Sequence, residues 1–488
     1  MKPPERPARP VIPIAPSTDT SPIAPPPGAS AELVSLYAAH QKIYPRSVSG
    51  LFSRLRWYMV FLTQLLFYGL PWLHWGERQA VLFDLAARRF YIFKLVLYPQ
   101  DFIYLAGLLV ICALSLFLFT AVAGRLWCGY ACPQTVYTEI FMWIERQTEG
   151  DRSAHMRRDQ GPWTMEKLAR KTAKQVLWIA VGWWTGFTFV GYFTPIHVLA
   201  GEIAQFSLGS WEVFWVFFYG FATYGNAGYM REQVCKHMCP YARFQSAMFD
   251  KDTLIVSYDA ARGEPRGARS KKRDLASSEL GACVDCSLCV QVCPTGIDIR
   301  NGLQYECIGC GACADVCDEV MDKMHYPRGL VKYSTENAMH NQWGAAEIVH
   351  HVFRPRVMLY TTVVWTIIAI VGISLLARAP FKVDVERDRK SLARELAGGV
   401  IENVFRLQIM NVTEAELRVH VQVDGLAGLK VVTDEDLTVA PAQSRWFVLR
   451  LQLPPGQATP GSHPIHFEID GQDDTTVLKE KAVFVVPH

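Results

Sequence analysis

Eight of the thirteen cysteines in the chain lie between Cys283 and Cys317. They form two copies of the spacing C-x2-C-x2-C-x3-C, within C-V-D-C-S-L-C-V-Q-V-C-P and C-I-G-C-G-A-C-A-D-V-C-D. In this spacing the first three thiolates reach three corners of one iron–sulfur cubane, while the fourth cysteine is too far along the chain and ligates the other cubane. The sequence therefore predicts a segment that folds around two [4Fe–4S] clusters and transfers single electrons.

The crossed pattern assigns four ligands to each cluster. The first cluster takes Cys283, Cys286, Cys289 and Cys317, and the second takes Cys293, Cys307, Cys310 and Cys313. Pro294 follows the first run, whereas Asp318 replaces the second proline, which removes a rigid turn but no ligand. Two structural zinc sites are the alternative, but zinc takes thiolates in two pairs, which fits these runs badly.

Apolar and aromatic residues are concentrated in a few long stretches. Half of the chain is apolar and fourteen residues are tryptophan. A membrane-spanning helix needs about 20 mostly apolar residues. Five stretches are predicted to span a membrane, residues 57–75, 102–123, 175–193, 211–229 and 357–377. Pro71 is expected to kink the first span near its outer end, and Cys112 within the second is interpreted as a packing residue.

Lysine and arginine in the connecting segments predict the orientation, because cytoplasmic loops carry an excess of both. Residues 124–174 are rich in them and residues 194–210 have none. The loop between the first two spans holds Arg78, Arg88, Arg89 and Lys94, which counts mildly against the assignment. The best fit places the N-terminus and residues 230–356 in the cytoplasm. Everything after the fifth span is then periplasmic.

These features predict a multi-domain protein with an α-helical membrane bundle, a cytoplasmic two-cluster ferredoxin-like insert and a C-terminal all-β sandwich. The first thirty residues contain ten prolines, which predicts disorder. The expected divisions are a disordered tail at 1–50, four spans within 51–250, the ferredoxin-like domain at 251–356, the fifth span at 357–377 and the sandwich at 378–488.

The sandwich is predicted from short stretches in which apolar and polar residues alternate. They are Phe405–Met410, Leu417–Val423, Trp446–Leu453 and Thr476–Val486. This segment has no cysteine, so we interpret it as a docking or dimerisation module, and a homodimer is among the expected assemblies.

Four further cysteines form two matching C-x3-C-P units. Cys128 and Cys132 follow the second span, in R-L-W-C-G-Y-A-C-P, and Cys235 and Cys239 follow the fourth, in E-Q-V-C-K-H-M-C-P-Y. In a helical turn the two thiols of each unit would share one face. The set suits structural zinc, a third iron–sulfur cluster without the usual three-cysteine run, or dithiol chemistry and Cu(I) binding.

Two classes of partner are not expected. No C-x-x-C-H sequence occurs and no histidine lies in the middle of a predicted span, so we predict no haem. The formal net charge of +3 gives no indication of nucleic-acid binding.

The order of these motifs resembles one family, the cytochrome c oxidase accessory proteins called CcoG, FixG or RdxA. The stretch from Trp127 to Thr135 is particularly similar to it. The resemblance implies a polyferredoxin of the bacterial inner membrane with an immunoglobulin-like C-terminal domain. It also implies a role with the assembly machinery of a cbb-type cytochrome oxidase, in which Cu(II) is reduced to Cu(I) for the copper centre.

On this basis we expect an oxidoreductase, a cupric reductase whose copper and redox site is Cys128, Cys132, Cys235 and Cys239. Two other interpretations remain open. One is a quinol-oxidising respiratory subunit similar to NapH and NosR, which share these motifs, and the other is a redox-sensing membrane scaffold.

Overall fold

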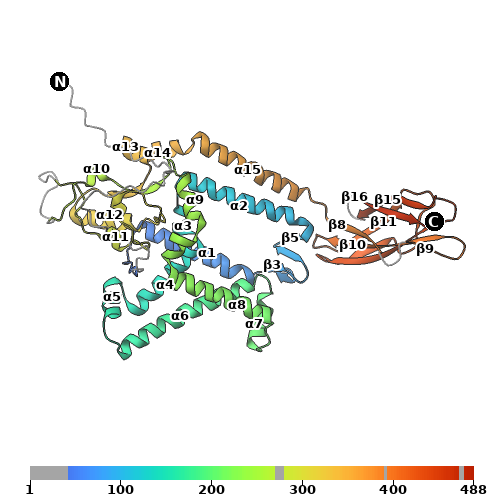
Figure 1. Ribbon diagram of the computed structural model, residues 1–488, viewed down its shortest axis with the longest axis horizontal. Coiled ribbons are helices and arrows are strands. Elements are labelled where there is room, and N and C mark those ends of the chain that lie inside the picture. Colours follow the sequence, from blue (N-terminus) through green and yellow to red (C-terminus); the bar gives the residue numbers. More distant parts are fainter. Residues whose placement is uncertain (1–41, 270–279, 389–392, 472–476, 488) are drawn as a thin grey trace, which may run out of the picture. The chain divides into compact units, whose positions relative to one another are not determined.

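The computed structural model describes residues 42–269, 280–388, 393–471 and 477–487. The chain divides into two compact units, residues 1–42 and 43–488, and the second is described below (Figure 1). The predicted disorder of residues 1–41 lies outside the described residues. Residues 43–50, which were assigned to the tail, instead pack against the cysteine-rich segment, where the Arg46 amide donates to the Gln291 carbonyl at 2.8 Å.

Helices form most of the first 376 residues. Those before the second C-x3-C-P unit are α1 Leu51–Gly69, α2 Phe102–Ala123, α3 Leu126–Tyr130, α4 Pro133–Glu149, α5 Arg152–Gln160, α6 Met165–Val190, α7 Ile196–Ala204 and α8 Ser210–Thr223. The helices from Pro240 onward are α9 Pro240–Met248, α10 Ala260–Gly263, α11 Leu288–Gln291, α12 Ala312–Met324, α13 Glu336–Asn341, α14 Ala345–Val352 and α15 Pro355–Leu376. Short 3-10 or π-helical turns are η1 Leu70–Trp72, η2 Pro99–Asp101, η3 Tyr224–Met230, η4 Val234–Met238 and η5 Ile299–Asn301.

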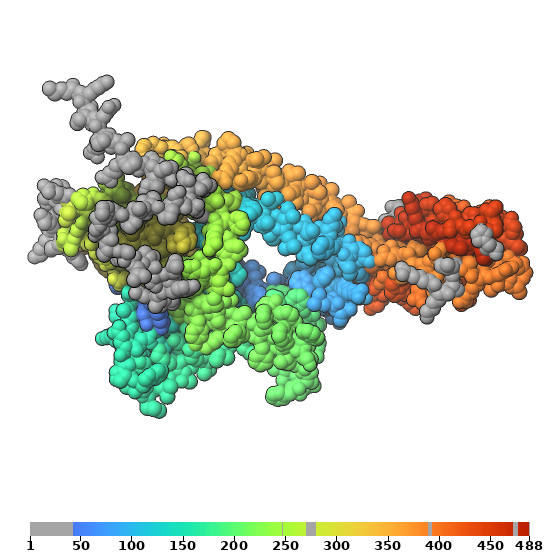
Figure 2. All heavy atoms as spheres, viewed as in Figure 1, coloured from blue at the N-terminus to red at the C-terminus, as the bar shows by residue number. Residues whose placement is uncertain are grey.

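Among the residues that the structure describes, two helices are long and apolar enough to cross a membrane, α2 with its preceding turn and α15. They lie side by side (Figures 1 and 2), and the Tyr104 hydroxyl is 3.0 Å from the Ser374 hydroxyl. Most of their apolar side chains are not covered by protein, including Leu109 and Ile370. Exposed apolar surface of this extent is typical of helices in contact with lipid.

The other three predicted spans coincide with α1, α6 and α8, with different bounds. The first helix ends at Gly69 and not at residue 75, because Pro71 falls in the 3-10 turn η1. The prediction of helix over residues 73–75 was therefore wrong. The helix α6 begins earlier than predicted, at Met165, where the Thr164 hydroxyl accepts from the Lys167 amide. After Thr223 the chain of α8 continues as the π-helical turn η3.

Hydrogen bonds link the connecting segments in two separate groups. In the first group, the Ser53 amide donates to Asp315 at 2.7 Å, which joins the start of α1 to the cysteine-rich segment. In the second, the Phe83 amide donates to the Tyr192 carbonyl at 2.7 Å, and the Tyr98 hydroxyl donates to the Asn411 carbonyl at 2.8 Å. The segments between α1 and α2, between α6 and α8, and after α15 thus contact one another, as five alternating crossings would require.

A small sheet that was not predicted lies between α1 and α2. The strands in the first 334 residues are β1 His74–Trp75, β2 Arg78–Gln79, β3 Val81–Asp84, β4 Arg89–Ile92, β5 Leu95–Leu97, β6 Ile255–Tyr258 and β7 Val331–Ser334. Strands β3, β4 and β5 form an antiparallel sheet in that order. Arg78 pairs with Glu414 at 2.9 Å and Arg89 donates to the Ala442 carbonyl at 3.0 Å. Two arginines that counted against the predicted orientation therefore bind the C-terminal domain.

The C-terminal domain is all-β, as predicted. Its strands are β8 Phe381–Arg387, β9 Arg394–Glu395, β10 Ile401–Asn411, β11 Leu417–Asp424, β12 Lys430–Val431, β13 Asp436–Val439, β14 Ser444–Leu453, β15 Gly461–Gly471 and β16 Val477–Val486. One sheet has the order β12-β14-β10-β8, with β9 paired to β10, and the other has the order β13-β11-β15-β16. Phe405, Phe467 and Phe484 are fully buried in the core between them. The predicted strands are β10, β11, β14 and β16, except that Thr476 lies outside the described residues.

Candidate metal centres

Four cysteines assigned to the first cluster line one cavity. Its empty volume is about 380 Å³, and Cys283, Cys286, Cys289 and Cys317 are among its lining residues. The first three come from the loop around the start of α11 and the fourth from α12. Residues far apart in the sequence thus line one cavity. Tyr258 and Arg300 complete one wall.

The four cysteines assigned to the second cluster line another cavity, of about 340 Å³. Cys293, Cys307, Cys310 and Cys313 are in its wall, and Cys289 of the first set lines it as well. The remaining wall is mostly apolar and includes Val256, Ile297 and Ile299. Burial raises the pKa of Cys307, and that of Cys317 in the other cavity, to about 12. A bound metal would be needed to hold these groups as thiolates.

The donor sets of both cavities fit iron–sulfur clusters. Each cavity offers the four thiols that a [4Fe–4S] cluster requires, on a short loop plus one distant cysteine. The assignment of each thiol to a cluster follows from the sequence pattern, so the ligand roles are predictions.

The first C-x3-C-P unit lies directly against the loop of the second cavity. A Cβ atom on Gly129, between the two cysteines of the unit, would lie 2.8 Å from the Gly309 carbonyl oxygen and 3.0 Å from the Cys310 Cα. Gly309 has a φ of +66°, and a Cβ atom added to it would lie 3.3 Å from the Arg125 carbonyl oxygen. Two backbones approach this closely only where both residues are glycine. Cys128 and Cys310 consequently share one apolar cluster.

The second C-x3-C-P unit contributes to the same cluster. Cys235, in the π-helical turn η4, packs in the cluster that contains Cys128. Cys132 and Cys239 each end their turn in extended conformation, immediately before the proline that begins α4 or α9. The first unit begins in the α-helix α3 and the second in a π-helical turn, but in neither does the helix include the second cysteine, which is the N-terminal cap residue of the next helix.

All four C-x3-C-P thiols interact electrostatically with one another. Burial raises the pKa of Cys128 to about 11 and that of Cys235 to about 12. Negative charge on Cys132 and Cys239 would raise both pKa values further. Cys128 and Cys235 thus pack in one cluster, and the four thiols are near enough to influence one another; we call this set the four-thiol site.

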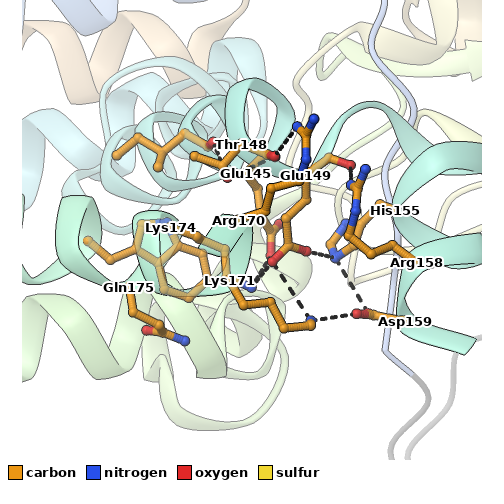
Figure 3. A network of polar contacts seen from close by, with 12 residues as sticks. Glu145, Thr148, Glu149, His155, Arg158, Asp159, Arg170, Lys171, Lys174 and Gln175 are labelled. Carbon is orange, nitrogen blue, oxygen red and sulfur yellow. Dashed lines mark hydrogen bonds and ion pairs between the residues drawn. The ribbon is translucent and has the colours of Figure 1, made fainter. Parts of the chain in front are cut away.

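An ionic network supports this site from the side of α4 and α6 (Figure 3). Glu145 pairs with Arg231 at 2.7 Å, and Glu149 accepts from His155 at 2.7 Å and pairs with Lys174 at 3.1 Å. Burial alone would raise the pKa of Glu149, but its bonds with His155 and Lys174 lower the pKa to about 2. The network joins α4, which follows Cys132, to the residues before Cys235.

Sequence reasoning did not identify this network. Glu145, Glu149 and His155 have ligand atoms within 4.8 Å of one another, a spacing that could hold a metal ion. However, Lys171, Lys174 and Arg231 already compensate the carboxylates, with Asp159 as a further acidic partner of Lys171. We therefore interpret the network as structural. The available signal was two glutamates spaced i, i+4 on α4 together with basic residues on α6.

Comparison with known protein families gives matches over three segments. Residues 230–336 match a model described as a 4Fe-4S dicluster domain, and residues 105–149 match one described as a 4Fe-4S binding domain. Residues 371–487 match the IG-like fold at the C-terminal of FixG. The second of these segments contains Cys128 and Cys132 but none of the cysteines of the two cavities.

Three curated proteins are similar over most of the chain. Nitrogen fixation protein FixG of Rhizobium meliloti is 39% identical over 422 residues, which cover 80% of each chain. Protein RdxB of Cereibacter sphaeroides is 41% identical over 386 residues, 77% of this chain and 80% of the relative. Protein RdxA of the same organism is 38% identical over 442 residues, 88% of this chain and 92% of the relative.

Proposed function

The chain belongs to the FixG/RdxA family of iron–sulfur electron-transfer proteins, and we propose that it is a membrane-bound cupric reductase. The substrate is Cu(II), and each ion takes up one electron to become Cu(I). The cysteines of the two cavities hold two [4Fe–4S] clusters, which supply one-electron transfer when bound. The product Cu(I) serves the assembly machinery of a cbb-type cytochrome oxidase.

The observation that carries this proposal is the contact between Gly129 and Gly309. It sets the four-thiol site against the second cavity, so that Cys128 and Cys310 belong to one buried cluster. Thiolates prefer Cu(I) to Cu(II), so a site made of Cys128, Cys132, Cys235 and Cys239 favours the reduced ion. The eight cysteines of the cavities then deliver electrons, and the four-thiol site receives the copper.

A third iron–sulfur cluster at the four-thiol site is the second candidate. The match of residues 105–149 to a 4Fe-4S binding domain favours it, because that segment holds Cys128 and Cys132. The usual three-cysteine run is missing there. The two candidates differ in iron content, since a third cluster would raise it from about eight to about twelve irons per chain.

The double variant Cys235→Ser/Cys239→Ser tests the proposal. The purified full-length protein should keep about eight irons and their sulfide but lose Cu(II) reduction, measured with a Cu(I)-specific chelator and a chemical electron donor. The matched control is Cys112→Ser, which removes an exposed thiol of α2 and should change neither quantity. Unchanged copper reduction in the double variant would place the copper site elsewhere. A substantial fall in iron would favour the third cluster.

We also propose that the protein is a multi-pass protein of the bacterial inner membrane. In this topology α1, α2, α6, α8 and α15 all cross, the N-terminus and the cysteine-rich segment are cytoplasmic, and the sandwich is periplasmic. A reporter fused after Gly281 should be active only as a cytoplasmic reporter, and one fused after His488 only as a periplasmic reporter. Finding both on one side would contradict an odd number of crossings.

A further inference from the structure

Arg125 is a buried cation at the junction of the four-thiol site and the second cavity. It lies in the turn between α2 and α3, and the residue is 6% exposed. Its Nε donates to the Gln245 Oε1 at 2.6 Å, and one terminal nitrogen donates to the carbonyls of Tyr305 and Cys307, the latter at 3.3 Å. All three of these acceptors are neutral, so they satisfy hydrogen bonds without balancing the charge.

The lack of an acidic partner distinguishes Arg125 from three other arginines near the cysteines. Arg56 pairs with Glu139, Arg231 pairs with Glu145, and Arg300 pairs with Asp298 at 2.7 Å. Within the described part of the chain, Arg125 forms no ion pair with a carboxylate. Because an unpaired buried charge is costly, an anion other than Asp or Glu is expected beside it.

Thiolates are the anions that we expect beside Arg125. Gln245, which is fully buried, accepts from Arg125 and has its Nε2 3.6 Å from the Cys128 Sγ. Arg125 therefore lies between the two sites: Gln245 links it to the Cys128 thiol of the four-thiol site, and its own hydrogen bond reaches the Cys307 carbonyl of the second cavity.

We propose that Arg125 is the shared counter-charge of the four-thiol site and the second cavity, and that Gln245 orients it toward Cys128. It is a positioning residue, since it acts through thiolates that hold the metal. Two neighbouring groups of thiolates with bound metal are both anionic and repel each other, and a buried positive charge between them lowers that repulsion. Adding an electron to either group is then less unfavourable. One electron leaves the second cavity for each Cu(II) that becomes Cu(I), a step that depends on the proposed function.

The test is a redox titration of the full-length protein, followed by electron paramagnetic resonance of the two clusters. Arg125→Gln should move the reduction potential of the cluster held by Cys310 to a more negative value and leave that of the cluster held by Cys286 unchanged. Arg125→Lys, which keeps the charge, should restore most of the shift. The matched variant Arg300→Gln removes a guanidinium from the first cavity and should not move the potential of the second.

A second variant keeps the test decisive if Arg125→Gln loses iron. Gln245→Glu keeps the guanidinium but places a carboxylate within hydrogen-bond distance of it, so the same potential should again become more negative. Iron retained in either variant with both potentials as in the parent overturns the proposal. A shifted potential in these variants, together with unchanged copper reduction in Cys235→Ser/Cys239→Ser, would leave the counter-charge in place and contradict the four-thiol copper site instead.

Discussion

The two cavities contain the same cysteine spacing but have different surroundings. In the first, Cys286 is exposed and the guanidinium of Arg300 is paired with carboxylates. In the second, Cys310 is buried, the backbone of a C-x3-C-P unit touches the cysteine loop, and the guanidinium of Arg125 has no such partner. The spacing of the cysteines alone does not distinguish the two cavities. For the proposed copper reduction we infer an order, in which electrons enter at the first cavity, where Cys286 is exposed, and leave from the second.

The largest effect is expected from removing one ligand of each cavity in turn. Cys286→Ser and Cys310→Ser should each lower the iron content from about eight to about four per chain, because serine oxygen is a poor cluster ligand. Only Cys310→Ser should abolish Cu(II) reduction by a small chemical donor, which can still reach the second cavity when the first is empty. Equal loss of copper reduction in both variants would break the proposed order.

A smaller effect is expected from separating the second cavity from the four-thiol site. Gly129→Ala would place a methyl group within 3.0 Å of three backbone atoms of the loop that includes Ile308 and Cys310. Backbone atoms cannot move aside as a side chain can, so the variant should lose about 1–3 kcal/mol of stability, measured by thermal unfolding. It should also reduce Cu(II) more slowly.

The control for this variant is Gly201→Ala in α7. Nothing lies within 4 Å of the added methyl group there, and alanine favours a helix, so stability should stay the same or rise slightly. If Gly129→Ala were as stable and as active as this control, the close contact of the two loops would not matter.

The smallest expected effect concerns the charge-compensated network, in contrast to the uncompensated Arg125. The pKa of Glu149 is lowered to about 2 from its ordinary 4.5. Its contribution to stability is therefore complete above pH 4.5 and decreases as the pH falls from 4.5 toward 2. Glu149 faces His155, Lys171 and Lys174.

Comparison of the parent with Glu149→Gln measures this contribution. The melting temperature of the parent should fall more steeply with decreasing pH than that of the variant, since the variant has no carboxylate to protonate at this position. Parallel pH profiles would show that the network does not depend on the charge of Glu149.

The sequence predicts those features that depend on local spacing. The cysteine runs place their residues around two cavities, and alternating patterns predict β10, β11, β14 and β16. It does not predict β15, because Pro464 and the glycines at its ends resemble a loop more than a strand. It does not predict the small sheet β3–β5 either, since these few residues resemble a loop between two spans.

The site beyond the cysteines could not be predicted, because it depends on contacts between distant segments. Arg125 counted only as a sign of cytoplasmic orientation, and nothing in its neighbourhood along the chain indicates that Gln245 and Cys307 surround it. Gly129 likewise has a role only because Gly309 lies against it. Such roles become visible once the fold brings the second half of the chain to the first.

A single-turnover experiment tests the central claim most directly. The full-length protein is reduced with dithionite, freed of excess reductant under anaerobic conditions and mixed with one equivalent of Cu(II), while cluster absorbance and Cu(I) are followed together. In the parent and in Cys112→Ser, cluster absorbance should recover as Cu(I) appears, with one Cu(I) formed for each electron lost. In Cys235→Ser/Cys239→Ser neither change should occur. Recovery in that double variant at the parent's rate would show that electrons reach copper without the four-thiol site and would contradict the account.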